Sequence, residues 1–145
     1  MMHIQTVART QLDELAELYT ELDQSETNIE RLRERFIALQ SNPDYTFIGA
    51  VDDGKLVDSV MGIRCYDLTG QCRPFMVLEN MIVSKSYYRK GIGQILVEAV
   101  EKIAIESDCH SVVLISSAWR TESHQFYEKL GFTKDAVYGF IKPLN

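Results

Sequence analysis

Two glycines stand between an apolar run and an amphipathic pattern, and this junction limits what the chain can fold into. Residues 76–83 predict a strand, and residues 92–106 predict a helix with its apolar side chains on one face. Gly91 and Gly93 lie between them, where a residue without a Cβ lets the backbone turn sharply and approach a ligand. The first amides of the helix lack intrahelical partners and lie at the positive end of its dipole. The junction therefore predicts an anion site.

Basic side chains reinforce this prediction. Arg89 and Lys90 directly precede Gly91, and Lys85 lies in the same segment. The glycine spacing matches neither the dinucleotide-binding fingerprint nor the Walker A loop. Because glycines also occur in plain tight connections between a strand and a helix, these residues alone leave a purely structural role open.

The composition indicates a soluble globular protein. With 145 residues, 46% of them hydrophobic, the chain is expected to form a single domain over residues 1–145. A net charge of −6 argues against nucleic acid as the main partner, and no apolar stretch approaches the ~18 residues that span a bilayer. Cys65, Cys72 and Cys109 have no metal-binding spacing, so we expect no metal, and reduced thiols in the cytoplasm.

Periodicity and turn residues predict a mixed α/β fold with the order β-α-α-β-β-β-α-β-α-β-β. Because the early strands are joined by short turns and the later ones by helices, the sheet should contain antiparallel and parallel pairs. Residues 52–55, Asp-Asp-Gly-Lys, predict a hairpin turn. Helices are predicted from Thr10, as the cap, to Leu22 and over residues 27–40, 92–106 and 122–130; strands are predicted over residues 3–8, 45–51, 56–66, 75–83, 111–116, 132–133 and 137–142.

A second informative segment carries His124, Phe126, Tyr127, Gly131 and Phe132. A Phe-Tyr pair on a helix more often belongs to a core than to a catalytic site. The strand and helix that follow the glycine turn would, however, return Tyr127 to the same edge of the sheet. Tyr127 is therefore a catalytic candidate.

These two motifs resemble those of the GCN5-related N-acetyltransferases (GNAT). That family has Gln/Arg-x-x-Gly-x-Gly/Ala at a strand-to-helix turn and, later, Phe-Tyr-x-x-x-Gly-Phe, and both motifs occur here in this order. The resemblance covers essentially the whole predicted element order and implies the GNAT fold, with a splayed central sheet. Two departures stand out: Tyr88 occupies the Gln/Arg position with Arg89 one place later, and Arg120 and Ser123 stand where many members carry Asn and Ala.

The resemblance implies an acyltransferase, specifically an N-acetyltransferase that moves an acetyl group from acetyl-CoA to a primary amine. The amine is expected to belong to a small molecule and to attack directly in a ternary complex. Two alternatives stay open: a non-catalytic sensor that binds CoA or acetyl-CoA, and a protein or peptide N-acetyltransferase. A weaker resemblance, through Arg120, His124, Phe126 and Tyr127, is to the small aminoalkylphosphonate N-acetyltransferase branch.

The resemblance also assigns residues to acetyl-CoA. Backbone groups at the glycine turn would hold the pyrophosphate, and the end of the preceding strand would run beside the pantetheine arm. Because these contacts are made mostly by the backbone, the departure at Tyr88 leaves binding intact. The residues assigned to the cosubstrate are Met81, Ile82, Val83, Tyr88, Arg89, Lys90, Gly91, Ile92, Gly93, Ser117 and Tyr127.

Acetyl transfer needs one group that protonates the departing thiolate and another that accepts the amine proton. We expect Tyr127 to be the acid, because a phenol is a good hydrogen-bond donor. Glu79 is the leading base, and strand alternation predicts that it shares a face with Met81 and Val83. His124 competes for the role of base because imidazole titrates near neutrality.

The acceptor amine is predicted to bind between the loops of residues 23–27 and 66–75. Carboxylates there would attract a cationic amine, whereas Arg73 points to a substrate with its own carboxylate or phosphonate. The sequence leaves this conflict open. The residues assigned to the substrate are Asp23, Glu26, Glu79, Arg120 and His124.

Oligomerisation is a further expectation. The strand predicted over residues 137–142 closes the sheet and would leave an edge with free backbone groups. We therefore expect a homodimer, and we expect neither a nucleic-acid nor a membrane partner.

Overall fold

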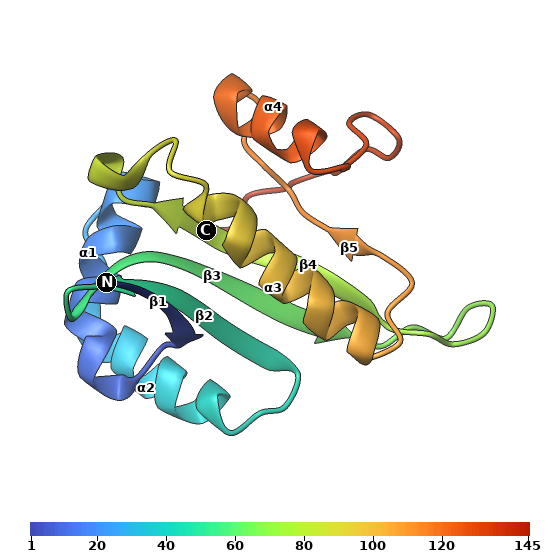
Figure 1. Ribbon diagram of the computed structural model, residues 1–145. Coiled ribbons are helices and arrows are strands. Elements are labelled where there is room, and N and C mark those ends of the chain that lie inside the picture. The colour runs from blue at the N-terminus through green and yellow to red at the C-terminus, as the bar shows by residue number, and fades with distance from the viewer. The chain divides into compact units, whose positions relative to one another are not determined.

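A five-stranded sheet organises the first of two units into which the chain divides (Figure 1). The computed structural model describes residues 1–145, with Met1–Val113 in the first unit and Leu114–Asn145 in the second. The strands follow their order along the chain, and all neighbours pair antiparallel except the last two. They are β1 (Met2–Thr6), β2 (Tyr45–Asp52), β3 (Lys55–Cys65), β4 (Phe75–Val83) and β5 (Val112–Val113). The predicted mixed α/β fold class is confirmed.

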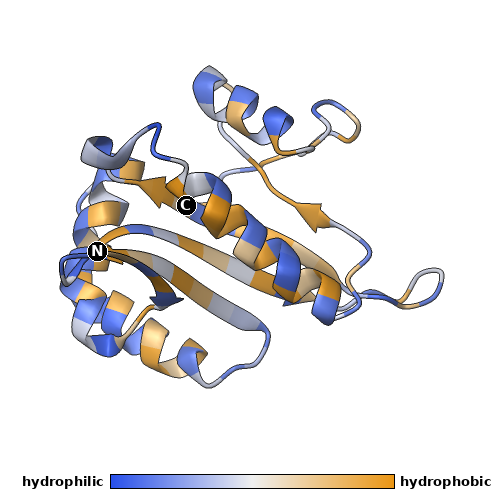
Figure 2. Cartoon of the chain, viewed as in Figure 1, coloured by the Kyte–Doolittle hydropathy of each residue, from blue (hydrophilic) through white to orange (hydrophobic).

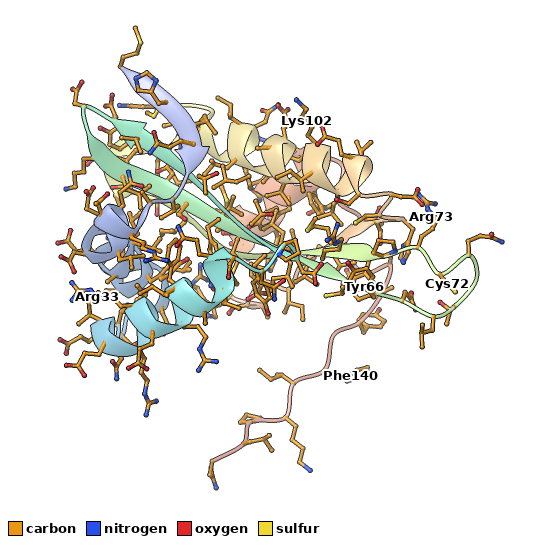
Figure 3. The ribbon with its side chains drawn as sticks, turned by 90° about the horizontal axis from the view of Figure 1, so that it is seen from below. Arg33, Tyr66, Cys72, Arg73, Lys102 and Phe140 are labelled. Carbon is orange, nitrogen blue, oxygen red and sulfur yellow. The ribbon has the colours of Figure 1, made fainter.

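Helices cover both faces of this sheet. Seen from below, Arg33 on α2 and Lys102 on α3 lie on opposite sides of it (Figure 3). α1 and α2 pack on one face and α3 on the other. None of the helices has the length and apolar character needed to cross a membrane. The helices are α1 (Leu12–Asp23), α2 (Ile29–Gln40), α3 (Ile92–Glu106) and, in the second unit, α4 (Thr121–Lys129), with short 3-10 turns η1 (Arg9–Gln11) and η2 (Lys85–Tyr87) before α1 and α3.

The face under α1 and α2 carries one continuous apolar core. Its side chains come from alternate strand residues and from one stripe of each helix, a pattern visible in the hydropathy colours (Figure 2). The ring centroid of Phe36 in α2 lies 5.0 Å from that of Phe47 in β2. Burying a side chain of this kind stabilises the fold by about 1.5–3 kcal/mol. The buried members are Val7, Leu12, Leu15, Leu18, Phe36, Phe47, Val51, Leu56 and Ile82.

The opposite face receives α3 at close range. Gly62 in β3 makes this possible, because a Cβ there would lie 3.3 Å from both Met76 Sδ and Val100 Cγ1. Leu96 and Val97 of α3 are fully buried. The missing side chain at Gly62 thus lets the helix that follows the glycine turn lie directly on β3 and β4.

β4 contains a β-bulge. The ladder pairs Met61 with Glu79 and then Ser59 with Ile82, so two residues of β4 oppose one residue of β3. Asn80 is one of those two, and it holds φ 52°, a left-handed conformation that asparagine adopts more readily than most residues. The extra residue turns β4 about its own axis between Glu79 and Ile82.

The bulge exchanges the faces to which the side chains of β4 point. Before it, Leu78 pairs with Gly62 and faces α3. After it, Ile82 belongs to the core under α1 and α2, although regular alternation would place it on the side of Leu78. Met81 and Val83, which flank Ile82, therefore face α3.

β4 and β5 pair only at their beginnings. The parallel register joins Met76 to Val112 and Val77 to Val113, and no further pair follows. The strand predicted over residues 111–116 is therefore correct in position but too long, because a strand needs a partner along its length. The edge of β4 beyond Val77 has no strand beside it, as a splayed central sheet requires.

Two local predictions in the first half have different outcomes. Asp53 and Gly54, at φ 49° and 80°, form the predicted hairpin turn between β2 and β3. Thr10 is predicted to cap the first helix, and this is wrong. The Gln11 side chain instead accepts a hydrogen bond from the Ala8 amide at 2.8 Å, and α1 begins after the 3-10 turn that this contact fixes.

The second unit lacks the two closing strands predicted over residues 132–133 and 137–142. Their apolar pattern is compatible with a strand, but a strand also needs a backbone ladder, and these residues join none. The side chains of Val137 and Phe140 are 80% and 94% exposed. The edge on which the homodimer expectation rested is thus not a strand, and the homodimer stays a prediction.

A buried carboxyl group fixes the chain where β4 ends. Asp58 in β3 is 0% exposed, and its Oδ1 accepts a hydrogen bond from the Ser84 amide at 3.0 Å. The same amide donates to the Val57 carbonyl oxygen at 3.1 Å, whereas Oδ2 of Asp58 has no hydrogen-bond partner. Burial raises the pKa of Asp58 to about 7; the Ser84 hydrogen bond opposes this rise and the charge of Glu21 adds to it.

We expect Asp58 to make the protein less stable as the pH rises from about 4 to about 7. Across this window the folded protein holds a proton that the unfolded chain has released, because an unfolded aspartate titrates near pH 3.9. The free energy of unfolding should therefore fall by at most about 1.4 kcal/mol per pH unit and level off above the folded pKa. Urea unfolding between pH 5 and pH 8 measures this slope.

Asp58→Asn should remove this component of the pH dependence. Asp135→Asn is the matched control, because Asp135 is exposed and should leave the slope unchanged. Equal slopes in the wild type and Asp58→Asn would contradict the assignment.

Candidate active site

The segment between β4 and α3 is held by side chains from elsewhere in the first unit. The Tyr87 hydroxyl donates to Asp52 Oδ2 at 2.7 Å, and the Lys85 amide donates to Glu21 Oε1 at 3.2 Å. The Tyr87 hydrogen bond lowers the pKa of Asp52, and the same contact raises the pKa of Tyr87. Lys90 Nζ lies 4.9 Å from the centre of the Tyr87 ring. The segment is thus fastened to α1 and to the end of β2.

Gly91 makes the turn into α3. It holds φ 78°, and a Cβ built on it would meet no atom within 4 Å, so the space beside it is open. Ile95 donates the first helical hydrogen bond to the Gly91 carbonyl oxygen at 3.3 Å, which leaves the preceding amides of α3 without intrahelical partners. No side chain caps this end of the helix. Free amides, open space and the helix dipole together suit a phosphate group.

The neighbours of Gly91 differ in what they contribute. Arg89 and Lys90 are exposed, and Arg89 holds a left-handed φ of 62°. Tyr88, at the position of the family's Gln/Arg, is 52% exposed. Gly93 lies buried inside α3 and has no positive φ, so of the two glycines only Gly91 contributes to the sharp turn.

The end of β4 lies between the bulge and this turn. Ile82 is buried in the core, while Met81 and Val83 are half-buried on the α3 side. Because β5 pairs with β4 only as far as Val77, the backbone of these residues is open along one edge. An extended ligand can add to such an edge as another strand would.

The Glu79 side chain lies on the face of the sheet covered by α1 and α2. It pairs with Met61, whose side chain packs against the core under α1 and α2, so the two side chains share that face. The prediction that Glu79 lies on the side of Met81 and Val83 is therefore wrong. Its reason is the bulge at Asn80, which breaks the regular alternation between them.

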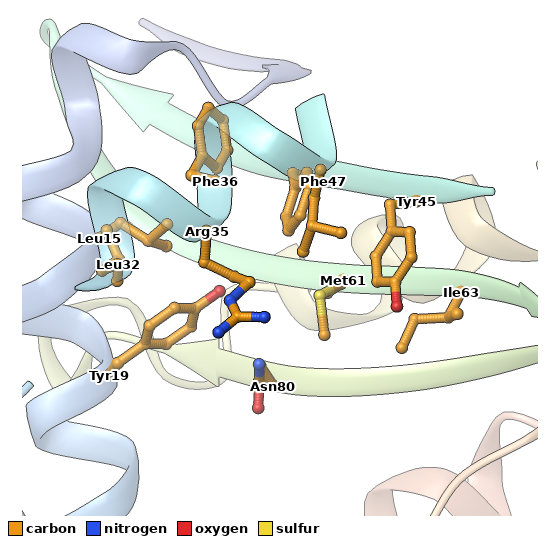
Figure 4. Close-up of a pocket in the computed structure, with 11 residues that line it drawn as sticks. Leu15, Tyr19, Leu32, Arg35, Phe36, Tyr45, Phe47, Met61, Ile63 and Asn80 are labelled. Atoms are coloured by element: carbon orange, nitrogen blue, oxygen red, sulfur yellow. The ribbon is translucent and has the colours of Figure 1, made fainter. Parts of the chain in front are cut away.

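A cavity of about 310 Å3 lies on the face of Glu79, between α1, α2 and the sheet (Figure 4). Most of its wall is made by apolar side chains of the two helices, β2 and β3. Asn80 is the member from β4, so the cavity reaches the bulge. Its other polar or sulfur-bearing members are Tyr19, Arg35, Tyr45 and Met61.

Tyr19 supplies a hydroxyl that stays protonated. Burial raises its pKa to about 12, although the side chains of Ser59 and Asn80 oppose that rise. The hydroxyl therefore remains a hydrogen-bond donor near neutral pH. In Figure 4 it points toward the guanidinium of Arg35.

The two loops predicted to bind the acceptor contribute nothing to this cavity. Asp23 and Glu26 are exposed, and Asp23 Oδ2 accepts a hydrogen bond from Ser25 Oγ at 2.5 Å. Arg73 forms an ion pair with Asp108 at 3.2 Å. The structure therefore does not bring Asp23, Glu26 or Arg73 to the cavity.

The sequence motifs do not reveal Arg35 as a functional candidate, although it carries a recognisable signal. It lies three residues after Leu32 and four before Leu39, next to the apolar stripe of α2. A charge next to such a stripe lies where it can line a groove beside the helix, and Arg35 lines the cavity while it stays exposed to solvent. Asn80 carries no comparable signal, because one polar residue in an apolar strand does not reveal a bulge.

The first turn of α4 and its N-cap, in the second unit, carry two of the predicted substrate residues. His124 Nε2 lies 2.9 Å from the Ser117 carbonyl oxygen, and since a carbonyl only accepts, this nitrogen carries the proton. The Arg120 guanidinium lies 4.9 Å from the centre of the Trp119 ring. Both contacts order the chain where α4 begins.

Tyr127 lies in a small aromatic cluster of the second unit. Its ring centroid is 5.1 Å from that of Phe126 and 5.7 Å from that of Phe132, both in edge-on geometry. Gly131, at φ 97°, reverses the chain after α4, and the Phe132 amide donates to the Tyr127 carbonyl oxygen at 3.1 Å. The spacing of the later motif thus has a local packing reason.

Two curated proteins are similar to part of the chain. It is 36% identical over 70 residues to the glucosamine 6-phosphate N-acetyltransferase of Candida albicans, which covers 48% of this chain and 45% of that protein. It is 38% identical over 55 residues to N-alpha-acetyltransferase 30 of Xenopus laevis, which covers 38% of this chain and 20% of that protein. The chain thus spans less than half the length of either relative.

Solved structures share the fold over nearly the whole chain. A putative acetyltransferase from Agrobacterium tumefaciens str. C58 has a TM-score of 0.88 at 25% identity and covers 97% of this chain and 99% of its own. The glucosamine-6-phosphate N-acetyltransferase from Arabidopsis thaliana has a TM-score of 0.85 at 19% identity, with 98% of each chain covered. The GNAT fold implied by the resemblance is therefore confirmed. The acetyltransferase (GNAT) family matches residues 11–132, and the chain belongs to that family.

Proposed function

We propose that the chain is an N-acetyltransferase that moves an acetyl group from acetyl-CoA to the primary amine of a small molecule. Membership of the GNAT family supports an acyltransferase activity and acetyl-CoA as the cosubstrate. The family match extends from residue 11 to residue 132 and so includes parts of both units. We therefore infer that residues 1–145 act as one catalytic domain.

One observation carries this proposal: the open edge of β4 leads from the bulge at Asn80 to the amides around Gly91. A long thioester that ends in a pyrophosphate needs an extended edge for its arm and an anion site at the far end. The amides of the pantetheine arm can pair with the edge beside Met81 and Val83. The pyrophosphate can accept from the first amides of α3.

The proposed reaction is a direct attack within a ternary complex. The neutral amine nitrogen attacks the thioester carbonyl carbon, the C–N bond forms, the C–S bond breaks, and CoA leaves as its thiolate. Glu79 accepts the proton that the amine loses, directly or through water, and Tyr127 donates a proton to the thiolate. A backbone amide beside the bulge can stabilise the negative charge that develops on the carbonyl oxygen.

The register of β4 supports the role of Glu79, and the later motif supports that of Tyr127. Glu79 shares its face of the sheet with Met61, which lines the cavity, and this places a carboxylate on the face from which an amine held there would approach β4. Tyr127 is assigned by its place in the Phe-Tyr-x-x-x-Gly-Phe motif. Ser117, Arg120 and His124 remain assigned to the cosubstrate and the substrate through the same resemblance.

Two other functions make different predictions. A non-catalytic sensor would bind acetyl-CoA and transfer its acetyl group to no amine. A protein or peptide N-acetyltransferase, suggested by the partial similarity to N-alpha-acetyltransferase 30, would prefer peptide N-termini to free amines. Release of the CoA thiol, measured with panels of small amines and of peptides, separates the three. Transfer to peptides alone, or to no amine, would reject the proposed function.

Gly91→Ala should weaken acetyl-CoA binding at least about 10-fold, which corresponds to about 1.4 kcal/mol. The new Cβ would occupy the open space beside the helix amides. Gly54→Ala is the matched control, because Gly54 has almost the same φ, 80°, and equally open surroundings, but lies in the hairpin turn between β2 and β3 and not at the start of a helix. Both variants should lose similar stability from left-handed strain.

Thermal unfolding with and without ligand measures this effect. Acetyl-CoA at 100 times its Kd should add about 2.7 kcal/mol to the free energy of unfolding of the wild type. The rise in Tm should persist in Gly54→Ala and shrink in Gly91→Ala. A similar rise with ATP or inorganic phosphate would show that the turn serves another anion.

Tyr127→Phe should lower kcat by about 100-fold and leave acetyl-CoA affinity unchanged. The substitution removes the proton donor but keeps the ring that packs between Phe126 and Phe132. Tyr138→Phe, at a tyrosine that is 75% exposed, should behave as the wild type. An unchanged kcat in Tyr127→Phe would remove Tyr127 from the acid role.

Glu79→Gln should change the pH dependence of the rate as well as its size. Without a carboxylate base, turnover should rise with pH only as the free amine in solution loses its proton. The quantity to measure is kcat/KM from pH 6 to pH 10 in both proteins. Superimposable profiles would exclude Glu79 as the base and would turn attention to His124.

A further inference from the structure

Arg35 is the one charged residue among the side chains that line the cavity under α1 and α2. Its guanidinium forms no hydrogen bond and no ion pair. Arg33, two residues earlier on the same helix, pairs instead with Asp13 at 2.7 Å. The cavity thus holds a cation that the protein itself leaves uncompensated.

The Arg35 side chain is exposed to solvent and also lines the cavity. In Figure 4, Arg35 extends from α2 toward the cavity, with its guanidinium between the Tyr19 hydroxyl and Asn80. Its donors are therefore accessible both to water and to a ligand that fills the cavity.

Apart from the Tyr19 hydroxyl and Asn80, the wall around Arg35 is largely apolar. Phe36, Phe47 and Tyr45 form an aromatic row, with centroid distances of 5.0 Å and 6.4 Å between successive rings. Leu32 and Leu39 of α2 complete this side of the cavity. A ligand that fills the cavity therefore needs an apolar body as well as a group that neutralises one positive charge.

That group is best matched by a carboxylate. Arg35 offers a planar fork of donors, which a carboxylate can engage with two hydrogen bonds. A phosphate or phosphonate near neutral pH carries more charge and usually gathers more than one cation, and no second cation lines this cavity. Polyamines would place like charges beside Arg35 and are disfavoured.

The side of the cavity that carries Asn80, where the Arg35 guanidinium also lies, faces the proposed chemistry. Asn80 lines the cavity and lies at the bulge, and Glu79 precedes it on the same face as Met61. An amine on this side would lie beside the open edge of β4. In an α-amino acid the carboxylate is attached to the same carbon as the amine, so it would engage the nearby Arg35 guanidinium. The apolar body would then pack along the aromatic row of the cavity.

We propose that the acceptor of this enzyme is an amino acid or close analogue with an apolar body, whose carboxylate is bound by Arg35 in this cavity. This inference rests on the proposed acetyl-transfer function for its consequence, but the binding site itself can be tested without turnover. Arg35 acts here as a specificity-determining residue, because it binds the carboxylate of the substrate and takes no part in the reaction at the amine.

The first test is binding measured by calorimetry with L-phenylalanine as the probe, in the presence and absence of CoA. Arg35→Gln should weaken binding about 10- to 100-fold, the usual effect of losing a charge-assisted hydrogen bond. Arg31→Gln, at an exposed arginine of the same helix outside the cavity, is the matched control. Phenethylamine, which has the same body without the carboxylate, should bind weakly and equally to all three proteins.

The second test is acetyl transfer to the same pair of amines. Wild type should prefer L-phenylalanine to phenethylamine in kcat/KM, and Arg35→Gln should abolish most of that preference while acetyl-CoA still raises the Tm. Arg35→Lys, which keeps the charge but not the fork, should restore part of the preference.

The outcomes separate the two proposals. Equal binding of L-phenylalanine to wild type and Arg35→Gln, or no binding to wild type with CoA present, would overturn the carboxylate site. Efficient transfer to amines without a carboxylate would also overturn it and leave the acetyltransferase proposal standing. Binding that depends on Arg35 without transfer to any amine would support the site and reject the proposed reaction.

Discussion

The β-bulge at Asn80 is the constraint on which the rest of the structure depends. One extra residue in β4 lets Ile82 fill the core under α1 and α2 while Met81 and Val83 turn toward α3. Glu79, before the bulge, keeps its side chain on the face of the sheet that carries the cavity. In the proposed reaction, the same strand therefore presents its open edge to acetyl-CoA and its Glu79 face to the amine, and the two meet at Asn80.

The turn after β4 shows how an acidic chain can hold a basic site. Three carboxyl groups hold this turn in place by accepting hydrogen bonds: Asp58 accepts from the Ser84 amide, Glu21 from the Lys85 amide, and Asp52 from the Tyr87 hydroxyl. Arg89 and Lys90 are left exposed on the outer side. The net charge of −6 therefore describes the whole chain but not this corner, where the carboxylates serve as backbone and hydroxyl acceptors.

Features determined by neighbouring residues were predictable, and those that depend on distant partners were not. The strand Phe75–Val83 and the helix Ile92–Glu106 have the predicted bounds, because periodicity and the glycine turn are local signals. The closing strands over 132–133 and 137–142 were wrong, since a ladder needs a partner that a pattern does not provide. The face predicted for Glu79 was wrong for a similar reason, because a bulge is defined by its pairing with the opposite strand. The cavity likewise could not be predicted, since its wall forms only when α2 packs on the sheet.

Arg89 combines a strained backbone conformation with a positive charge, so neither can be changed without the other. Its left-handed φ of 62° is a conformation that costs a non-glycine residue about 1 kcal/mol, and its guanidinium stands beside the turn of Gly91. Glycine at this position would relax the backbone but discard the charge. Selection for thermal stability would thus favour glycine at position 89, whereas selection for acetyl-CoA affinity would favour arginine. The residue found at this position in related chains should therefore show which property was selected.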